Sequence, residues 1–460
     1  MSHRGSRVLR LEALARVEGE GALHLQVHDG TVAQARLRIY EPPRFFEAFL
    51  VGRGHTEPPD ITARICGICP VAYQMSACLA IENACGVTVD GPLAQLRRLL
   101  YCGEWIESHT LHIHLLHAPD FLGHPSAVEL ARDDRAAVER GLRIKQAGNA
   151  VLEQLGGRSI HPVNVRVGGF YRTPAPNELR ALAGRLRQAR EDALETVRWV
   201  AGFDFPDAVC DYALLALSEP GRYAVDSGTP TVLPASDDSG PASGDGDTGP
   251  WPPPRAFRVA DFEQHVHEEQ VAHSTALTAT LDGRRYLTGA LARFALNSRW
   301  LHPAAAEAAR DAGLGDCAAG AVCRNPFRSI VVRAVEVVHA IEEALCIIDA
   351  YEPPARPAID VRPREAVGTG ATEAPRGLLY HRYAVTEDGT LSAARIIPPT
   401  AQNQSAIEAD LRRTVQTRLD MPGPPAADEE LTTLCERVIR NHDPCISCAA
   451  HFLDLTVEHT

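Results

Sequence analysis

The chain has 460 residues, 45% hydrophobic and 23% charged, which is the composition of a folded globular protein with a sizeable core. Its formal net charge of −13 argues against nucleic acid as a principal partner, because binding phosphates requires a basic surface. No apolar run approaches the ~20 residues of a membrane span, and the N-terminal residues contain no apolar signal core. We therefore expect neither a membrane span nor a secretory signal.

The first half of the chain changes from a strand pattern to helix patterns. Residues 1–43 alternate apolar and polar residues around Asp29–Gly30, which predicts a β-hairpin region. From 44 to 130 the pattern is helical, interrupted by the glycine and proline of "RICGICP". Two long amphipathic helices are predicted, one ending at Gly156–Gly157 and one over 177–200.

The second half is mostly helical in pattern. Residues 234–255 are rich in Pro, Gly, Ser and Asp and are predicted to be an exposed low-complexity excursion. Helices are predicted over 255–281 and, deeply buried, over 328–351, followed by a hairpin turning at Asp388–Gly389 and by C-terminal helices. There is no nucleotide-binding glycine motif. We predict one large domain, residues 1–460, with an α+β, predominantly α fold: a large helical bundle core with small β-sheets.

Four of the twelve cysteines form two Cys-x-x-Cys pairs, Cys66 with Cys69 and Cys445 with Cys448. Two such pairs suit a soft metal, because each places two sulfurs on one turn. Structural zinc sites usually separate their pairs by about 15 to 20 residues, so the long gap here disfavours zinc without excluding it. A redox pair of thioredoxin type would need only one pair in a strand–helix context. The other cysteines are scattered singly, which indicates buried small residues in a reducing cytoplasm. The preferred interpretation is a buried four-thiolate transition-metal site.

The sequence around both pairs favours thiolates. Asp443–Pro444 has the pattern of a helix N-cap followed by proline at the first helical position. Cys445 would then lie in the first helical turn, where the helix dipole lowers a thiol pKa. Arg64, two residues before Cys66, would lower that thiol pKa electrostatically.

These motifs resemble the large subunit of a nickel–iron hydrogenase. "RICGIC" near the N-terminus and "DPCISCAAH" near the C-terminus carry the resemblance. "ARVEGEG", "GRSIHPVNVRVGGF", "GTGATEAPRGLLYH" and "RIIPPTAQNQ" resemble further elements of the family, in the same order. The resemblance covers essentially the whole chain and implies the fold of such a subunit.

The resemblance implies that Cys66, Cys69, Cys445 and Cys448 bind nickel. Cys69 and Cys448 would also bridge to an iron that carries cyanide and carbon monoxide ligands. Splitting H2 heterolytically requires an electrophilic metal and a nearby base, and a thiolate can act as that base. The implied activity is reversible oxidation of H2 to protons and electrons.

Two residues beside the metals are implied to be catalytic. Glu18 matches the family glutamate that passes protons from Cys445 toward solvent; the alternative is an ordinary surface glutamate. The family usually has histidine two positions later, where this chain has Glu20. Arg376 matches an arginine over the metals that polarises the incoming molecule; the alternative is a structural arginine paired with Glu373.

Hard ligands near the C-terminus are implied to bind magnesium. Glu47, His451 and the backbone carbonyl of Arg395 match this site, while the alternative for Glu47 is a solvated helix carboxylate. Pro399 and Thr400 fall where the family packs the cyanide ligands of the iron.

Two departures from the family pattern resemble its cytoplasmic, cofactor-linked branch, whose electrons pass to NAD(P), a deazaflavin or a heterodisulfide reductase. Tyr73 and Ser108 stand where many relatives have histidine and aspartate. A histidine cluster nearby invites a metal-site interpretation, but we favour packing or support of neighbouring residues. Its members are His109, His112, His114 and His117.

The family implies partners for electron transfer and assembly. The chain has no further iron–sulfur cysteine pattern, so electrons would leave through an iron–sulfur small subunit and then pass to NAD(P)- or flavin-binding subunits. Residues 452–460, "FLDLTVEHT", resemble an extension that a maturation protease removes after His451 once insertion factors have loaded nickel. The rival hypotheses are a non-catalytic subunit of the respiratory complex I type and a zinc-stabilised interaction protein.

Overall fold

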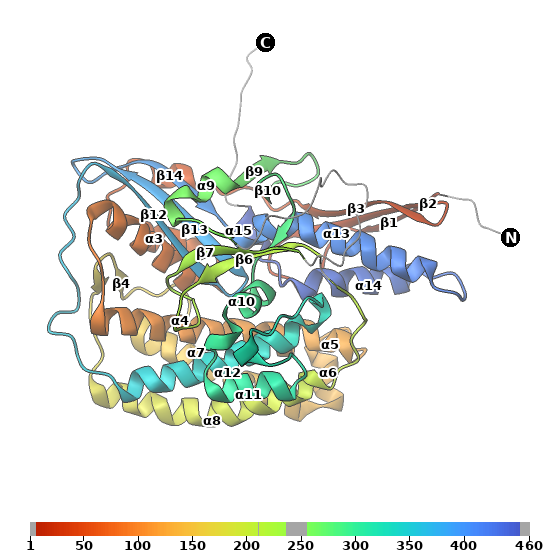
Figure 1. Cartoon of the computed structure of the whole chain (residues 1–460), viewed down its shortest axis with the longest axis horizontal. Helices are drawn as coiled ribbons and strands as arrows, with labels where there is room; N and C mark the ends of the chain where they lie inside the picture. The colour runs from red at the N-terminus through yellow and green to blue at the C-terminus, as the bar shows by residue number, and fades with distance from the viewer. Residues whose placement is uncertain (1–5, 210, 236–254, 451–460) are drawn as a thin grey trace, which may run out of the picture.

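A computed structural model describes residues 6–209, 211–235 and 255–450. Its largest layer is a bundle of long helices, seen in the lower half of Figure 1. Helix α4 packs on α7 and α12, and α12 packs on α8. The helices of this layer are α4 Gly91–Leu111, α7 Arg135–Gly156, α8 Pro176–Ala201, α11 Pro303–Asp311 and α12 Ser329–Asp349. The predicted helical bundle core is confirmed.

Composition explains how these helices pack. α12 is apolar nearly throughout and is buried along most of its length, whereas α8 is amphipathic and buries one face. α4 and α7 approach closely because each has a glycine at the crossing. A Cβ atom at Gly148 would lie 2.7 Å from the backbone nitrogen of Glu107, and one at Gly103 would lie 2.9 Å from the side chain of Val151.

A three-stranded antiparallel sheet of β12 Ala366–Ala374, β13 Gly377–Val385 and β14 Leu391–Ile397 lies above the bundle (Figure 1). α3 Pro70–Cys85 packs directly on β12. This contact requires glycine, since a Cβ atom at Gly368 would lie 2.0 Å from the carbonyl oxygen of Ala80. The sheet thereby holds α3, and the Cys69 that precedes it, in place.

The N-terminal sheet consists of β1 Ser6–Leu11, β2 Gly21–His28 and β3 Thr31–Ile39. Asp29 and Gly30 both have positive φ at the β2–β3 turn, as the predicted hairpin requires. Helices α13 Pro399–Asp420 and α14 Asp428–Asn441 cover one face of this sheet (Figure 1).

The prediction of a helix over 255–281 is wrong. This segment contains β8 Arg255–Ala256, the four-residue helix α9 Phe262–His265, and a hairpin of β9 Val266–Gln270 with β10 Leu277–Leu281. β8 joins a four-stranded sheet that the sequence did not reveal, of order β11-β6-β7-β8. Its other strands are β6 Ala213–Ser218, β7 Thr229–Leu233 and β11 Tyr286–Leu287. A short, continuously apolar run such as that of β6 cannot be told from a buried helix by periodicity.

The remaining elements are short. They are α1 Phe46–Leu50, α2 Pro58–Thr62, α5 Ala118–Phe121, α6 Ala127–Asp133, α10 Ala290–Asn297, α15 Ile446–Ala449, β4 Val165–Arg166 and β5 Gly169–Phe170, with a π-helical segment at His112–His117. Most of the predicted low-complexity excursion lies outside the described residues. Cys346 is exposed, contrary to the prediction for the scattered cysteines. Within the described ranges no helix has the length and apolarity to cross a membrane.

Candidate metal centre

The two Cys-x-x-Cys pairs meet in the core. The Sγ atoms of Cys66 and Cys445 are 3.4 Å apart, and those of Cys69 and Cys448 are 3.5 Å apart. All four sulfurs lie within 4.8 Å of one another, and all four side chains are buried. Cys69 directly precedes α3, whose first residue is Pro70, and Cys445 directly precedes α15. Two helix starts from opposite ends of the chain thus present the sulfurs to one point.

Backbone contacts hold the two loops together. The amide of Ile446 donates to the carbonyl oxygen of Glu18 at 3.0 Å, which ties the C-terminal loop to the N-terminal segment. The guanidinium of Arg44 donates to the carbonyl oxygen of Ile65 at 2.7 Å and also to that of Ser447. Arg44 therefore clamps both cysteine loops, a role that no motif in the sequence indicated.

The prediction that Asp443 is an N-cap is wrong. Asp443 has a positive φ of 49°, and α15 starts at Ile446 with Cys445 at the N-cap position. The expected lowering of the Cys445 pKa is also wrong, because burial raises that pKa well above its usual value. A four-residue helix cannot offset the loss of solvent around a fully buried thiol. Asp443 instead turns its carboxylate toward Arg376.

The donor set fits a soft metal cation. Burial also raises the pKa of Cys448, while hydrogen bonds from Cys445, Cys448 and Cys69 hold the pKa of Cys66 well below its usual value. The pocket thus stabilises one thiolate by itself, and bringing all four to the thiolate form requires a cation. Sulfur separations of 3.4 and 3.5 Å suit thiolates that share a metal at about 2.3 Å. Nickel and iron are compatible with such ligands.

Glu18 lies against the cysteine site and leads out of it. The Cys445 thiol donates to Glu18 Oε2 at 3.0 Å, and the amide of Ser447 donates to the same oxygen at 3.1 Å. Burial raises the pKa of Glu18, and a negative charge on Cys66 raises it further. The Ser447 hydroxyl in turn donates to Glu41 Oε2 at 2.9 Å, and the Glu41 side chain is 14% exposed. Ser447 therefore contacts Glu18 through its amide and Glu41 through its hydroxyl, so a series of contacts leads from the buried thiol to a partly exposed carboxylate.

Glu20, which replaces the expected histidine, is exposed. Only its backbone joins this series, since its amide donates to Glu41 Oε2 at 3.3 Å. The replacement therefore leaves the contacts of Glu18 intact.

Arg376 is buried, with 2% exposure, and pairs with Asp443 rather than Glu373. Its Nε donates to the Asp443 carbonyl oxygen at 2.9 Å and its Nη2 to Oδ1 at 3.1 Å. Its Nη1 has no hydrogen-bond partner among the described residues. Glu373 lies 3.2 Å from Arg293 instead. The alternative in which Arg376 pairs with Glu373 is therefore wrong.

Thr400 contacts the centre directly. Its Oγ1 accepts a hydrogen bond from the Cys445 amide at 2.9 Å, which leaves the hydroxyl hydrogen able to donate elsewhere. Pro399, the first residue of α13, is buried beside it. The start of α13 therefore adjoins the cysteine loop.

The residues expected to bind magnesium are partly brought together. The amide of Ile396 donates to Glu47 Oε1 at 2.7 Å, so the backbone after Arg395 lies against this carboxylate. The Arg395 guanidinium is 3.9 Å from Glu47 Oε2. Glu47 is 9% exposed, so the alternative of a solvated carboxylate is wrong. His451 lies outside the described residues.

Tyr73 and Ser108, the two departures from the family pattern, are both buried. Neither hydroxyl oxygen has a hydrogen-bond partner in the part of the chain that the structure describes. Burial raises the pKa of Tyr73 well above its usual value, and charge on Cys448 and Cys69 adds to this effect. Tyr73 is thus a neutral phenol close to the sulfurs.

The four histidines at 109–117 do not converge on a point. His114 stacks on Trp199, with ring centroids 5.2 Å apart, whereas His109 Nε2 lies 3.0 Å from Glu336 Oε2. Burial lowers the pKa of His112 and of His114 to about 3, so both are neutral. Within the described ranges, the four cysteines form the one group of His, Cys, Asp or Glu residues placed to hold a metal ion. The expectation of packing roles for the histidines is confirmed.

Comparison with known proteins agrees with the geometry. The model of the family described as nickel-dependent hydrogenase matches residues 44–143 and 322–451. The chain is 33% identical to sulfhydrogenase 1 subunit alpha of Pyrococcus furiosus, covering 97% of this chain and 98% of the relative. It is 31% identical to sulfhydrogenase 2 subunit alpha of the same organism, covering 97% and 100%. A solved structure of an NAD+-reducing [NiFe]-hydrogenase in the H2-reduced state superposes with a TM-score of 0.81 at 26% identity, covering 97% and 99%.

Proposed function

The chain belongs to the nickel-dependent hydrogenase family, and we propose that it is a catalytic large subunit that interconverts H2 with two protons and two electrons. The observation that carries this proposal is the convergence of four buried cysteine sulfurs from opposite ends of the chain. The same observation disfavours a non-catalytic relative, because such a protein needs neither the four thiols nor a buried arginine beside them.

The four cysteines would hold nickel, and Cys69 and Cys448 would also hold the iron. Bound there, the two metals supply the electrophilic site that polarises H2 and accepts its electrons. The protein supplies the base. Cys445 is suited to this task because its sulfur already shares a hydrogen bond with Glu18.

Glu18 would carry the proton away from Cys445. Burial raises its pKa above the usual value of a glutamate, which favours uptake of a proton from the thiol. We assign the next positions to the Ser447 hydroxyl and to Glu41, because the 2.9 Å contact joins them and Glu41 reaches the surface. Proton exit would thus run within this chain.

Arg376 would act as a fixed positive charge over the centre. Asp443 fixes the guanidinium from one side through two contacts, which leaves Nη1 available to a small molecule at the metals. Thr400, whose oxygen accepts from the Cys445 amide, would donate its hydroxyl to a cyanide ligand of the iron, with Pro399 packing beside it. Carbon monoxide would complete the iron ligands.

A magnesium ion would bind Glu47, the Arg395 carbonyl oxygen and His451, with waters completing its coordination. Removal of residues 452–460 by a maturation protease would leave His451 at the new C-terminus. This ion would then fix the C-terminal loop that carries Cys445 and Cys448.

Electrons would leave through an iron–sulfur small subunit. The loop that contacts the Cys66 segment is a suitable docking point, because His161 Nδ1 lies 2.7 Å from the Ala63 carbonyl oxygen. Beside it Ile160, Val163 and Tyr171 expose 56%, 44% and 57% of their surface. Likeness to an NAD+-reducing enzyme supports NAD(P)-linked partner subunits for this chain. A cytoplasmic location would follow from partners of that kind.

Metal analysis with infrared spectroscopy of the purified protein separates the hypotheses. We expect nickel and iron near one each, with absorption bands of bound carbon monoxide and cyanide. Zinc alone would indicate a zinc-stabilised interaction protein, and the absence of bound metal would indicate a non-catalytic subunit. Either result contradicts the proposed function.

A further inference from the structure

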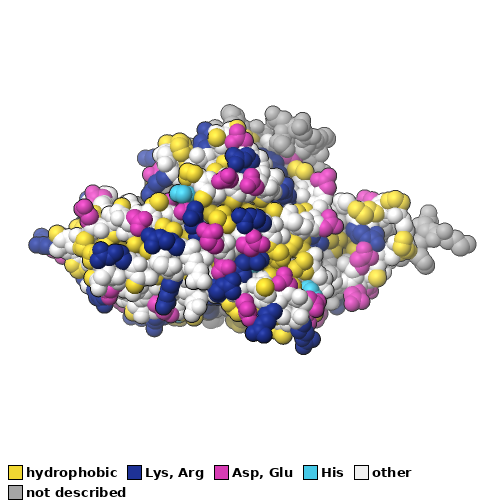
Figure 2. All heavy atoms as spheres, turned by 90° about the horizontal axis from the view of Figure 1, so that it is seen from below, with side chains coloured by type: hydrophobic (Ala, Val, Ile, Leu, Met, Phe, Trp, Pro, Cys, Tyr) yellow, Lys and Arg dark blue, Asp and Glu magenta, His cyan; other side chains and the backbone are white. Residues whose placement is uncertain are grey.

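Arginine side chains are mostly paired with acids over the helical layer. On α7 and α8, Arg143 contacts Asp192 at 2.7 Å, and Arg190 forms an ion pair with Glu342. Figure 2, which views the molecule from this side, shows basic and acidic side chains interspersed over the surface. Such a surface is typical of a face that stays in solvent.

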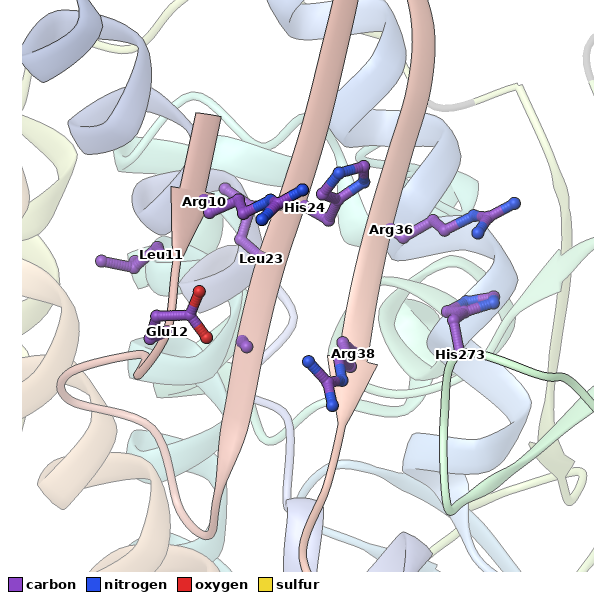
Figure 3. Close-up of a pocket in the computed structure, with 9 residues that line it drawn as sticks. Arg10, Leu11, Glu12, Leu23, His24, Arg36, Arg38 and His273 are labelled. Atoms are coloured by element: carbon purple, nitrogen blue, oxygen red, sulfur yellow. The ribbon is translucent and has the colours of Figure 1, made fainter. Parts of the chain in front are cut away.

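The uncovered face of the N-terminal sheet is different. In the strand register, Arg10 on β1 lies opposite His24 on β2, and His24 lies opposite Arg36 on β3. The three side chains therefore form one row across the sheet. Figure 3 shows this row crossing the three strands, with Arg38 next to it on β3. None of these four side chains forms a hydrogen bond or ion pair with another described residue, and only their backbones are paired in the sheet. By contrast Arg7, also on β1, pairs with Asp428.

The row lines a groove of about 320 Å³, together with Glu12 and His273 (Figure 3). Neither of these neutralises the arginines. Glu12 forms no ion pair within the described ranges, and His273 lies 2.8 Å from Glu408 of α13, which already balances it. Three arginines therefore face one glutamate.

Arg10 on β1 and Arg36 on β3 flank His24, and Arg38 lies two residues from Arg36 on the same strand. Three positive charges thus gather on one sheet face, and their mutual repulsion conflicts with the stability of the free chain. The conflict is confined to one face, because the opposite face of the sheet packs apolar residues against α13 and α14. An arrangement that is unfavourable alone and paired nowhere in the described chain points to a binding partner that supplies the acids.

We propose that this groove binds an acidic segment of another subunit of the hydrogenase complex. The inference rests on the proposed function, because it requires a multi-subunit enzyme. The open sheet face favours a protein segment over a small anion, since it offers extended arginine side chains rather than a nest of backbone amides. Val8, 46% exposed on the same strand as Arg10, adds an apolar contact of the kind protein interfaces use.

Charge reversal tests the proposal. The variant Arg10→Glu/Arg36→Glu/Arg38→Glu is compared with Arg132→Glu/Arg180→Glu/Arg356→Glu, which changes the net charge equally at exposed arginines without described ion pairs. Association of each chain with the purified remaining subunits is measured at several salt concentrations. We expect the first variant to associate roughly 10- to 100-fold more slowly at low salt and to lose most of the salt dependence. Equal rates for the two variants would overturn the proposal.

Photocrosslinking identifies the occupant. p-Benzoylphenylalanine replaces Arg36 in the assembled complex, and in a control complex it replaces Arg180. A crosslink from position 36 alone to an Asp- or Glu-rich segment of another subunit supports the proposal. A crosslink to a second copy of this chain, no crosslink in an assembled complex, or stabilisation of the free chain by inorganic phosphate through these arginines with unchanged association would each overturn it. Nickel content of the same samples tests the proposed function separately, because it does not depend on this groove.

Discussion

The four cysteines and the four histidines of residues 109–117 are equally numerous, yet their arrangement in sequence and in space is opposite. The cysteines form pairs whose contacting members, such as Cys66 and Cys445, are 379 residues apart, and their sulfurs converge. The histidines are close together in the sequence, but their rings contact different elements. A dense run on one helix projects its side chains in several directions, whereas the starts of two helices can aim at one point. Convergence, rather than density, identifies the site.

Removing one converging ligand is expected to have the largest effect. Cys445→Ser replaces a soft thiolate by a hydroxyl that stays protonated, so nickel binding and hydrogen–deuterium exchange should both be lost. Cys346→Ser, at an exposed cysteine outside the centre, should retain both. Exchange that persists in Cys445→Ser would show that the nickel assignment is wrong.

Removing the proton carrier should leave the metals in place. Glu18→Gln keeps the shape of the side chain but cannot take up a proton, so turnover should fall by about 10²- to 10⁴-fold with unchanged nickel content. The matched control is Glu20→Gln, two residues away and exposed. Equal turnover in the two variants would exclude the route through Glu18.

Arg376→Lys should have a smaller effect, in the range of about 10²- to 10³-fold on turnover. Lysine keeps the charge but cannot hold both contacts to Asp443, so the cation is displaced from the metals. Arg382→Lys, which loses a comparable contact to Glu263 away from the centre, should remain active. If the turnover of Arg376→Lys equals that of the control, the fixed orientation of the guanidinium does not contribute to catalysis.

The smallest effect is expected in the histidine run. His114→Phe should leave nickel content unchanged and alter the free energy of unfolding by only about 1 kcal/mol at neutral pH, because one hydrogen bond to Thr196 is lost and the stacking on Trp199 is kept. Loss of nickel in this variant would contradict the claim that the cysteines bind the metal and the histidines only pack.

Acid should destabilise the His114→Phe variant less than it destabilises the wild type. The pKa of His114 is about 3 in the folded protein, below its ordinary value of 6.5, so between these pH values the unfolded chain binds a proton that the folded chain does not. Stability is therefore lost as pH falls through this window, by up to about 1.4 kcal/mol per pH unit for each such histidine. Urea midpoints should fall less steeply with acid in His114→Phe, and parallel profiles would count against the buried neutral state.

The sequence predicted the parts of the site that depend on residue type, and missed those that depend on the path of the chain. The cysteine pairs, Glu18 and Arg376 stand in recognisable motifs, and the structure brings all of them together. Arg44 and Ser447 were missed, because one acts through backbone carbonyls and the other through a hydroxyl, and such contacts have no sequence pattern.

Fold prediction shows the same division. The amphipathic helices α7 and α8 and the Asp-Gly hairpins were predicted from periodicity and turn chemistry. The strands β6 and β9 were not predicted. β6 is uniformly apolar, and β9 has only five residues. Each is defined by pairing with a later strand, β7 or β10 respectively. Pairing partners in the tertiary structure decide such segments.

The central claim, that both ends of the chain bind one nickel ion through four sulfurs, is tested most directly by X-ray absorption at the nickel edge of the active enzyme. We predict a first coordination shell dominated by sulfur, which loses sulfur or disappears in Cys445→Ser. A shell of nitrogen and oxygen atoms, or nickel whose surroundings do not change in that variant, would contradict the claim.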